Sequence, residues 1–338
     1  MISEVFDPIQ VESFFGYKGL FSRVKLLLYP SRKNVGELGT TSHLIHHLRG
    51  QSRVLKGLRN SANTRFDLVF STQDAGYIAD LNLPVIQWGY FPRSFPRSLR
   101  SHSPGDFART IRYLPLRMYY DRKISRIGLV LAISQYSKEY LDKEWKRPSE
   151  LVYPACNMVA SGVKRDLVVT VARAVPVKRL ELFWEVARRR PEYEFTMLLT
   201  QDPTFMEYSM SLARDAPPNG TTVFNPSKEA YHRILEEAKI YMHLMEREHF
   251  GITIVEAMSA SCVPVVHDSG GPREIVHNDV GFRWRKIDDI PDLVDKGMSI
   301  SPSAAAERRA QDFNYEIFEK RLSSIFSRFE QSNPRPIL

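Results

Sequence analysis

Short apolar runs alternate with amphipathic segments through the second half of the chain. Runs of strand length cover residues 167–171, 195–199, 222–224, 240–244 and 263–267. Residues 179–189, 227–238 and 251–260 lie between these runs and place apolar side chains at helical spacing. Strands that alternate with helices form βαβ crossovers, so the pattern predicts a doubly wound α/β domain with a parallel sheet.

The first half carries a sparser version of the same pattern. It predicts strands at residues 67–72, 83–88, 128–133 and 151–154, and a helix at Gln135–Trp145. A chain of 338 residues is too long for one core. We therefore expect an amino-terminal domain over residues 1–158, a second domain over 159–313, and an amphipathic terminal helix over 314–331. Periodicity is lost near residues 154–162, where we place the linker.

Composition narrows the class of protein. The chain is 43% hydrophobic with mean hydropathy −0.31, and it contains no apolar run long enough to span a membrane. Its first ten residues have no signal-peptide core. Cys156 and Cys262 lie in or beside apolar segments, which is typical of core thiols. These features predict a soluble protein in a reducing, cytosolic compartment.

Candidate chemistry is concentrated where the run 240–244 gives way to the helix at 251–260. Ligands of parallel sheets collect at the carboxyl ends of the strands. The amides of Gly251, Ile252 and Thr253 open the helix and form, with its dipole, an anion site suited to phosphate. Glu256 lies about one turn further on in an apolar helix, where a carboxylate needs hydrogen-bond donors. Ribose hydroxyls would serve.

Two acids frame this segment. Glu248 and Glu256 are separated by seven residues, and Phe250-Gly251 and the tetrapeptide Ser-Gly-Gly-Pro at 269–272 accompany them. The acids alone are weak evidence, because about a quarter of typical residues are charged. Solvated charges at helix ends are the alternative interpretation. The combination is harder to assign to chance.

The run resembles the E-x7-E signature of retaining GT-B glycosyltransferases, the glycosyl transferase group 1 family. Within it, the order of His243, Met245, residues 248–252, Glu256 and residues 269–272 is similar to that of the α-1,2-mannosyltransferases that act on dolichol-linked oligosaccharide. Ser261 replaces the usual glycine after the helix, and Ile254 replaces a valine. Both changes bear on helix packing.

A second motif follows the run at 167–171. Residues 172–178, Ala-Arg-Ala-Val-Pro-Val-Lys, resemble the family's G-R-x-x-P-x-K motif, with Ala172 in place of its glycine. This resemblance implies that Arg173 and Lys178 contact one diphosphate, although either cation alone is more often a plain surface charge. In the first domain, Tyr90 takes the position of the acceptor-side histidine of many members.

The resemblance implies two Rossmann-like domains facing across a cleft, with a terminal helix that crosses back to the first domain. It implies that Glu248 holds the donor sugar, that Phe250, Gly251, Ile252, Thr253 and Glu256 contact the donor, and that no enzymatic nucleophile is needed. The chain has no Asp-x-Asp triplet and no zinc-like His and Cys spacing, so we expect neither metal nor cofactor. The donor and acceptor implied are GDP-mannose and a lipid-linked or cell-surface glycan. A UDP-sugar-dependent exopolysaccharide transferase and a non-catalytic nucleotide-sugar or membrane-binding protein remain as alternatives.

Most of the chain's net charge of +8 comes from the stretch between Arg93 and Arg126, which has nine cationic and two acidic residues mixed with aromatics and leucines. Such a stretch suits an anionic membrane surface, a pyrophosphate head group, nucleic acid or plain solvent. With a lipid-linked acceptor, the membrane is favoured over nucleic acid, at the cytoplasmic face.

Residues 1–66 are too few for the units that usually open a GT-B domain. A buried amphipathic piece at 14–21, a strand at 24–29 and a glycine-containing loop at 34–41 are the elements we expect there. The domain is either reduced or begins after its first βα unit, and the second reading is favoured.

Overall fold

The computed structural model describes residues 69–72, 84–92, 104–300 and 303–332. These divide into two compact units. Unit 1 holds residues up to Ile133, Ser137–Val152 and the chain from Leu322 onward, and unit 2 holds Ser134–Tyr136 and Tyr153–Arg321. The elements expected within residues 1–66 lie outside the described residues.

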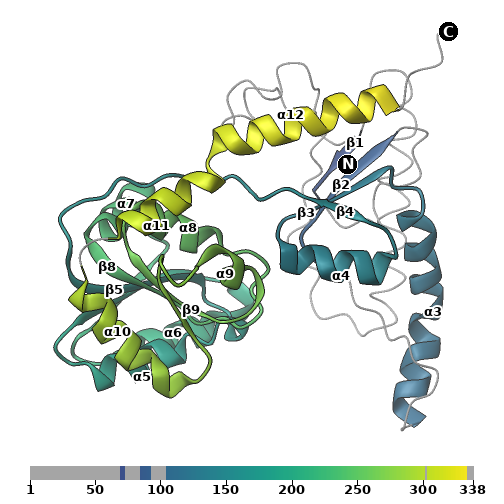
Figure 1. The fold of residues 1–338 in the computed structure, drawn as a ribbon. Helices are drawn as coiled ribbons and strands as arrows, with labels where there is room; N and C mark the ends of the chain where they lie inside the picture. Colours follow the sequence, from purple (N-terminus) through teal and green to yellow (C-terminus); the bar gives the residue numbers. More distant parts are fainter. Residues whose placement is uncertain (1–68, 73–83, 93–103, 301–302, 333–338) are drawn as a thin grey trace. The chain divides into compact units, whose positions relative to one another are not determined.

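Unit 1 is built on a parallel sheet of four short strands in sequential order (Figure 1). The strands are β1 (Val69–Ser71), β2 (Val85–Gly89), β3 (Leu129–Ala132) and β4 (Ser149–Leu151). Helices α3 (Pro104–Ile124) and α4 (Gln135–Trp145) separate β2 from β3 and β3 from β4. Apolar side chains of α3, β3 and α4, among them Tyr120, Ile124, Val130 and Leu141, form its buried cluster.

The end of the terminal helix α12 (Tyr315–Ser332) packs on this sheet. The ring of Phe326 meets Phe70 of β1 edge to face at 5.6 Å, and Arg328 donates to the Glu150 carboxylate at 2.7 Å. Residues of α12 before Leu322 belong to unit 2, so one helix contributes to both units.

Unit 2 contains a six-stranded parallel sheet in the order β10-β9-β8-β5-β6-β7. Its strands are β5 (Arg165–Arg173), β6 (Glu194–Thr200), β7 (Gly220–Phe224), β8 (Ala238–His243), β9 (Val263–His267) and β10 (Phe282–Trp284). The order reverses beside β5, with β8 on one side and β6 on the other. A reversal of this kind is where open α/β sheets bind ligands.

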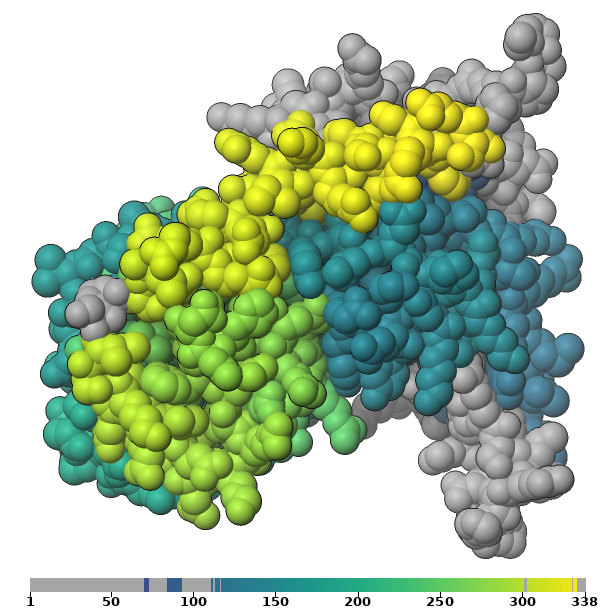
Figure 2. Space-filling view, in the orientation of Figure 1, coloured from purple at the N-terminus to yellow at the C-terminus, as the bar shows by residue number. Residues whose placement is uncertain are grey.

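Helices cover both faces of this sheet. Those following the strands are α5 (Glu181–Arg189), α6 (Met206–Arg214), α7 (Lys228–Glu237), α8 (Ile252–Ser259), α9 (Gly270–Ile275), α10 (Ile290–Ser299) and α11 (Ala304–Ala310). Helices α10 and α11, coloured yellow-green to yellow, lie on the visible surface of this unit (Figure 2). Helix α8 packs against β8 and β9 and is covered by α11.

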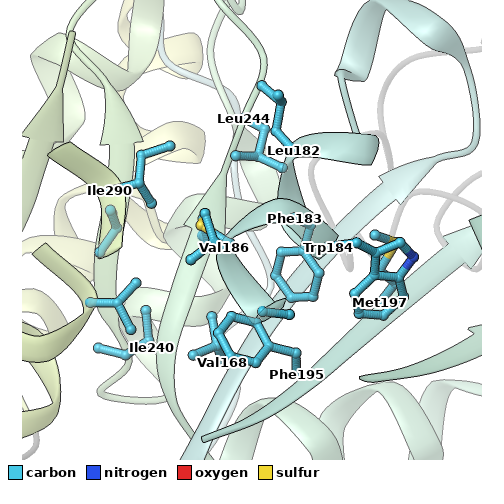
Figure 3. Close-up of a cluster of buried hydrophobic side chains, with 14 of the residues drawn as sticks. Val168, Leu182, Phe183, Trp184, Val186, Phe195, Met197, Ile240, Leu244 and Ile290 are labelled. Atoms are coloured by element: carbon cyan, nitrogen blue, oxygen red, sulfur yellow. The ribbon is translucent and has the colours of Figure 1, made fainter. Parts of the chain in front are cut away.

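The main core lies on one face of the sheet. It joins Phe183, Trp184 and Val186 of α5 to alternate residues of the strands, including Phe195 and Met197 of β6 and Ile240 and Met242 of β8 (Figure 3). Side chains alternate between the faces of a strand. Tyr241 and His243 of β8 therefore point to the opposite face, the face that α8 covers.

The expected parallel α/β architecture is confirmed in both units. Three details differ from the pattern analysis. The last strand of unit 1 ends at Leu151, whereas the prediction extended it to residue 154. Strand β10 was not predicted, because only three residues form it. The basic stretch forms the long helix α3 from Pro104 onward, and its residues 93–103 lie outside the described part.

Candidate functional site

The loop after β8 is held in place by the glycines of the turn after β9. The amide of Gly271 donates to the carbonyl of Glu248 at 2.8 Å. Gly270 has φ of +66°, and a Cβ at that position would lie 2.3 Å from the same carbonyl oxygen. Only glycine permits so close an approach at a left-handed φ. The tetrapeptide at 269–272 thus serves the structure by fixing the backbone that carries Glu248.

Glu248 sits between two basic side chains. Its carboxylate accepts a hydrogen bond from the Lys178 ammonium, and Nε2 of His243 lies 3.5 Å from Oε2. The Glu248 and Lys178 side chains are 15% and 22% exposed. Burial would raise the pKa of Glu248, but the nearby His243 and the hydrogen bond and charge of Lys178 hold the pKa well below its usual range. The carboxylate is therefore ionised throughout the neutral range.

Helix α8 begins directly after this cluster. Gly251 precedes it with φ of 113°, again a left-handed conformation, so the chain turns sharply from the loop into the helix. First-turn amides of a helix have no intrahelical acceptor. Ile252 is exposed at this end, while the Thr253 hydroxyl bonds the Tyr241 phenol at 2.6 Å. The arrangement presents free amides and the positive end of a helix dipole.

Phe250 contributes packing to this corner. Its ring is buried between Tyr153 and Phe313, with ring centroids 5.8 and 5.5 Å away. Only the backbone of Phe250 is left to face a ligand. Its side chain instead fixes where α8 begins.

A pocket of about 510 Å³ opens at the carboxyl ends of β5, β6 and β7. Its lining residues are Val171, Leu198, Thr200, Asn225, Pro226, Lys228, Tyr231, Thr253 and Glu256. Its lining is mixed, and among the described residues that form it Glu256 supplies the carboxylate.

Glu256 already has two protein donors. The Tyr231 phenol and the Asn157 amide, the latter at 3.1 Å, both donate to its carboxylate. Burial raises the pKa of Glu256, and these two hydrogen bonds oppose the rise. A carboxylate has about four acceptor positions, so a hydroxyl ligand in the pocket can still bond to it.

The other two predicted residues, Arg173 and Tyr90, make no hydrogen bond or ion pair with these groups within the described part of the chain. Arg173 ends β5, and its exposed guanidinium lies 3.7 Å from Asp202. Tyr90 belongs to unit 1, where it follows β2 and stacks on Trp88 at 6.1 Å. The structure thus pairs Lys178 with Glu248 and places Thr253 and Glu256 in the lining of one pocket.

Pattern reasoning missed Tyr231, Asn157 and Asp202, which pair with predicted residues. Nothing in the local sequence marks them. Tyr231 reads as one aromatic in an amphipathic helix, and Asn157 falls in the aperiodic linker. Among the described residues, no group of three or more His, Cys, Asp or Glu side chains is arranged to hold a metal ion.

Solved structures share this two-domain architecture, the GT-B fold. Alr3699/HepE from Anabaena, in complex with UDP and glucose, covers 88% of this chain with 84% of its own, at TM-score 0.66 and 14% identity. Sucrose-phosphate synthase from Thermosynechococcus elongatus covers 90%, with 86% of its own chain, at TM-score 0.68 and 15% identity. At these identities the likeness is one of fold alone.

Residues 159–304 match the family model for glycosyl transferases group 1. This segment includes Arg173, Lys178, Glu248 and Glu256.

Two curated relatives are mannosyltransferases. The chain is 29% identical over 106 residues to the GDP-Man:Man(3)GlcNAc(2)-PP-Dol alpha-1,2-mannosyltransferase of Dictyostelium discoideum, covering 30% of this chain and 21% of the relative. It is 30% identical over 208 residues to the alpha-1,3/1,6-mannosyltransferase ALG2 of Rhizomucor pusillus, covering 56% and 42%. The chain thus matches less than half the length of either relative. In the described part of the chain, no helix is long and apolar enough to cross a membrane.

Proposed function

We propose that this protein is a retaining glycosyltransferase that moves mannose from GDP-mannose to a lipid-linked or cell-surface glycan. The observation that carries the proposal is the placement of Lys178 and Glu248 beside the start of α8, next to the pocket that Glu256 lines. A cation and a free helix amino terminus match the negative charge of a diphosphate, and two carboxylates can accept hydrogen bonds from the hydroxyls of a sugar and a ribose. The names of the curated relatives support mannose as the sugar and a dolichol-linked glycan as the acceptor.

In this proposal the diphosphate lies against the first turn of α8, with Lys178 and Arg173 as its cations. The nucleoside occupies the pocket, where Glu256 accepts from the ribose hydroxyls. Glu248 accepts hydrogen bonds from the hydroxyls of the sugar. Neither catalysis nor donor binding needs a metal.

The proposed reaction follows from where charge develops. The bond between the sugar's anomeric carbon and the diphosphate oxygen breaks, which leaves negative charge on the phosphate and positive charge on the ring. The negative charge on the phosphate is stabilised by Lys178, Arg173 and the amides of Gly251, Ile252 and Thr253. The positive charge on the ring is stabilised by the Glu248 carboxylate. The acceptor hydroxyl then attacks from the same face and passes its proton to the leaving phosphate. Configuration is retained without an enzymatic nucleophile.

Donor competition tests the proposal. The protein is incubated with radiolabelled GDP-mannose, UDP-glucose or UDP-N-acetylglucosamine, and release or transfer of label is measured. We expect GDP-mannose alone to be consumed, and Glu248→Ala to abolish turnover while retaining GDP binding. Consumption of a UDP sugar alone would refute the mannose assignment and favour the exopolysaccharide alternative. Nucleotide binding without turnover of any donor would favour a non-catalytic role.

We also propose that the basic stretch, including α3, contacts the anionic membrane that carries such an acceptor. Ile111, Leu114 and Met118 lie at helical spacing on α3 and are 48%, 40% and 64% exposed. An exposed apolar row within a basic stretch suits an anionic lipid surface.

Sedimentation with phosphatidylserine vesicles at low salt tests this contact. Met118→Asp should reduce co-sedimentation, whereas Met210→Asp, a change at a similarly exposed methionine of α6 in unit 2, should not. Equal sedimentation of both variants would contradict the proposal.

Tyr90 is proposed to face the acceptor, and Tyr90→Phe should raise the KM for the acceptor alone.

A further inference from the structure

His243 lies at the end of β8, on the face of the sheet opposite the main core. Its neighbours on the strand, Met242 and Leu244, are buried in that core. Strand alternation then directs His243 and Tyr241 to the other face. Tyr241 bonds Thr253 in the first turn of α8, and His243 faces Glu248. One strand face thus contacts both the helix terminus and the first acid of the site.

The Nε2 nitrogen of His243 is a buried polar atom. The side chain is 5% exposed, and within the described residues its Nε2 makes no hydrogen bond. The nearest charged group recorded for that nitrogen is Oε2 of Glu248, at 3.5 Å. A buried nitrogen without a partner is costly, so a small approach that completes this hydrogen bond is favourable.

Neighbouring groups fix the orientation of the ring. The Tyr241 ring is stacked on it at 6.4 Å with an interplanar angle of 19°. The indole N–H of Trp284 donates to the His243 carbonyl at 3.4 Å, which ties the strand end to β10. The imidazole is therefore aimed at Glu248 before any ligand binds.

Lys178 cannot be the sole support of Glu248 if the proposed function holds. A lysine ammonium is a compact charge, and the proposed diphosphate competes with Glu248 for it. Once Lys178 turns toward the phosphates, the carboxylate loses counter-charge in a site that is largely buried. The charged groups around His243 are Glu248 and, beyond it, Lys178, while Tyr241 stacks on its ring.

We propose that His243 is a positioning residue, whose Nε2–H holds the Glu248 carboxylate in the orientation that binds the donor sugar while Lys178 engages the leaving diphosphate. This inference rests on the proposed function and adds to it the group that orients the sugar-binding acid. His243 does not touch the substrate in this account.

The test compares the affinities of GDP-mannose and GDP by calorimetry on the full chain. His243→Leu removes the N–H at similar volume, and His243→Gln keeps an N–H donor. We expect the preference for GDP-mannose over GDP to fall about tenfold in His243→Leu and to recover largely in His243→Gln. The affinity for GDP itself should stay within about twofold of the wild-type value in both variants. His277→Leu, at an exposed histidine after α9, is the control and should preserve the preference.

Two further comparisons keep the inference falsifiable. If His243 acts through Glu248, His243→Leu should cause no further loss in a Glu248→Gln background, and an additional loss would overturn the role. An unchanged GDP-mannose preference in His243→Leu would also overturn it. If the wild type binds neither ligand, the proposed function fails. The contact is then tested by a double-mutant cycle of His243→Leu and Glu248→Gln in urea unfolding, where coupling supports it and additivity overturns it.

Discussion

Breaking the pair between Lys178 and Glu248 should destabilise unit 2 measurably, whatever the ligand is. The two side chains are 22% and 15% exposed, so the pair is closer to a buried ion pair than to a surface one. Removing one partner of a fully buried pair costs about 3–5 kcal/mol. Because His243 remains 3.5 Å from Glu248 and some solvent reaches Lys178, we expect about 2 kcal/mol for Lys178→Met.

The assay is a double-mutant cycle of Lys178→Met and Glu248→Gln. Urea unfolding of the full chain is followed by the fluorescence of its four tryptophans, of which Trp184 and Trp284 lie in unit 2 and are both 1% exposed. We expect a coupling free energy of about 1.5–3 kcal/mol. The matched control is the pair of Arg189 and Asp288, which lie 3.0 Å apart but are 47% and 87% exposed. Its coupling should stay below about 1 kcal/mol.

The coupling should also depend on pH with a definite sign. The folded state holds the pKa of Glu248 below the ordinary value of 4.5, so the unfolded chain takes up this proton first. The stabilisation is therefore complete above about pH 4.5 and is lost as the pH falls toward the depressed pKa. A coupling no larger than that of the control pair, or one that grows in acid, would refute the reasoning.

Three further outcomes are expected. Gly270→Ala should lower the free energy of unfolding of unit 2 by about 2–5 kcal/mol, since its Cβ would lie 2.3 Å from a carbonyl oxygen at φ of +66°; a loss under about 0.5 kcal/mol in urea unfolding would contradict this. Burial raises the pKa of the Cys262 thiol to about 11 and also raises that of Cys156, so iodoacetamide at pH 8 should modify neither in the folded protein and both in urea, as mass spectrometry reports. Burial raises the pKa of Glu256 above its ordinary value of 4.5, so its ionisation should lower the stability of the folded state as the pH rises from 4.5 through the raised pKa. Over that pH range, thermal unfolding should show the stability of Glu256→Gln rising relative to wild type. The opposite trend would count against the burial of this carboxylate.

The alternation of apolar runs was enough to predict the architecture of unit 2, because parallel strands with both faces buried read as continuous apolar segments. The same reasoning predicted that Lys178 and Glu248 lie at the same edge of the sheet, because both follow strands of one parallel sheet. Their pairing was not predicted. It depends on side-chain geometry in the loops, where Gly270 and Gly271 set how closely two segments approach.

Partners distant in sequence were also beyond pattern reasoning. Glu256 was expected to need hydrogen-bond donors, and ribose was the only one considered. The structure supplies Tyr231, which is 25 residues away, and Asn157, which is 99 residues away. Long-range pairs of this kind follow from topology and leave no periodic signal. For Phe250 the motif position predicted a contact with the donor. In the structure its ring packs between Tyr153 and Phe313.

We propose that unit 2 binds a nucleoside diphosphate between Lys178, Arg173 and the start of α8. A crystal structure of the protein with GDP tests it most directly. We expect the diphosphate within hydrogen-bond distance of Lys178 and the first-turn amides of α8, with the ribose hydroxyls on Glu256. A nucleotide bound elsewhere, or one that leaves the contact between Lys178 and Glu248 unchanged and the pocket empty, would contradict it.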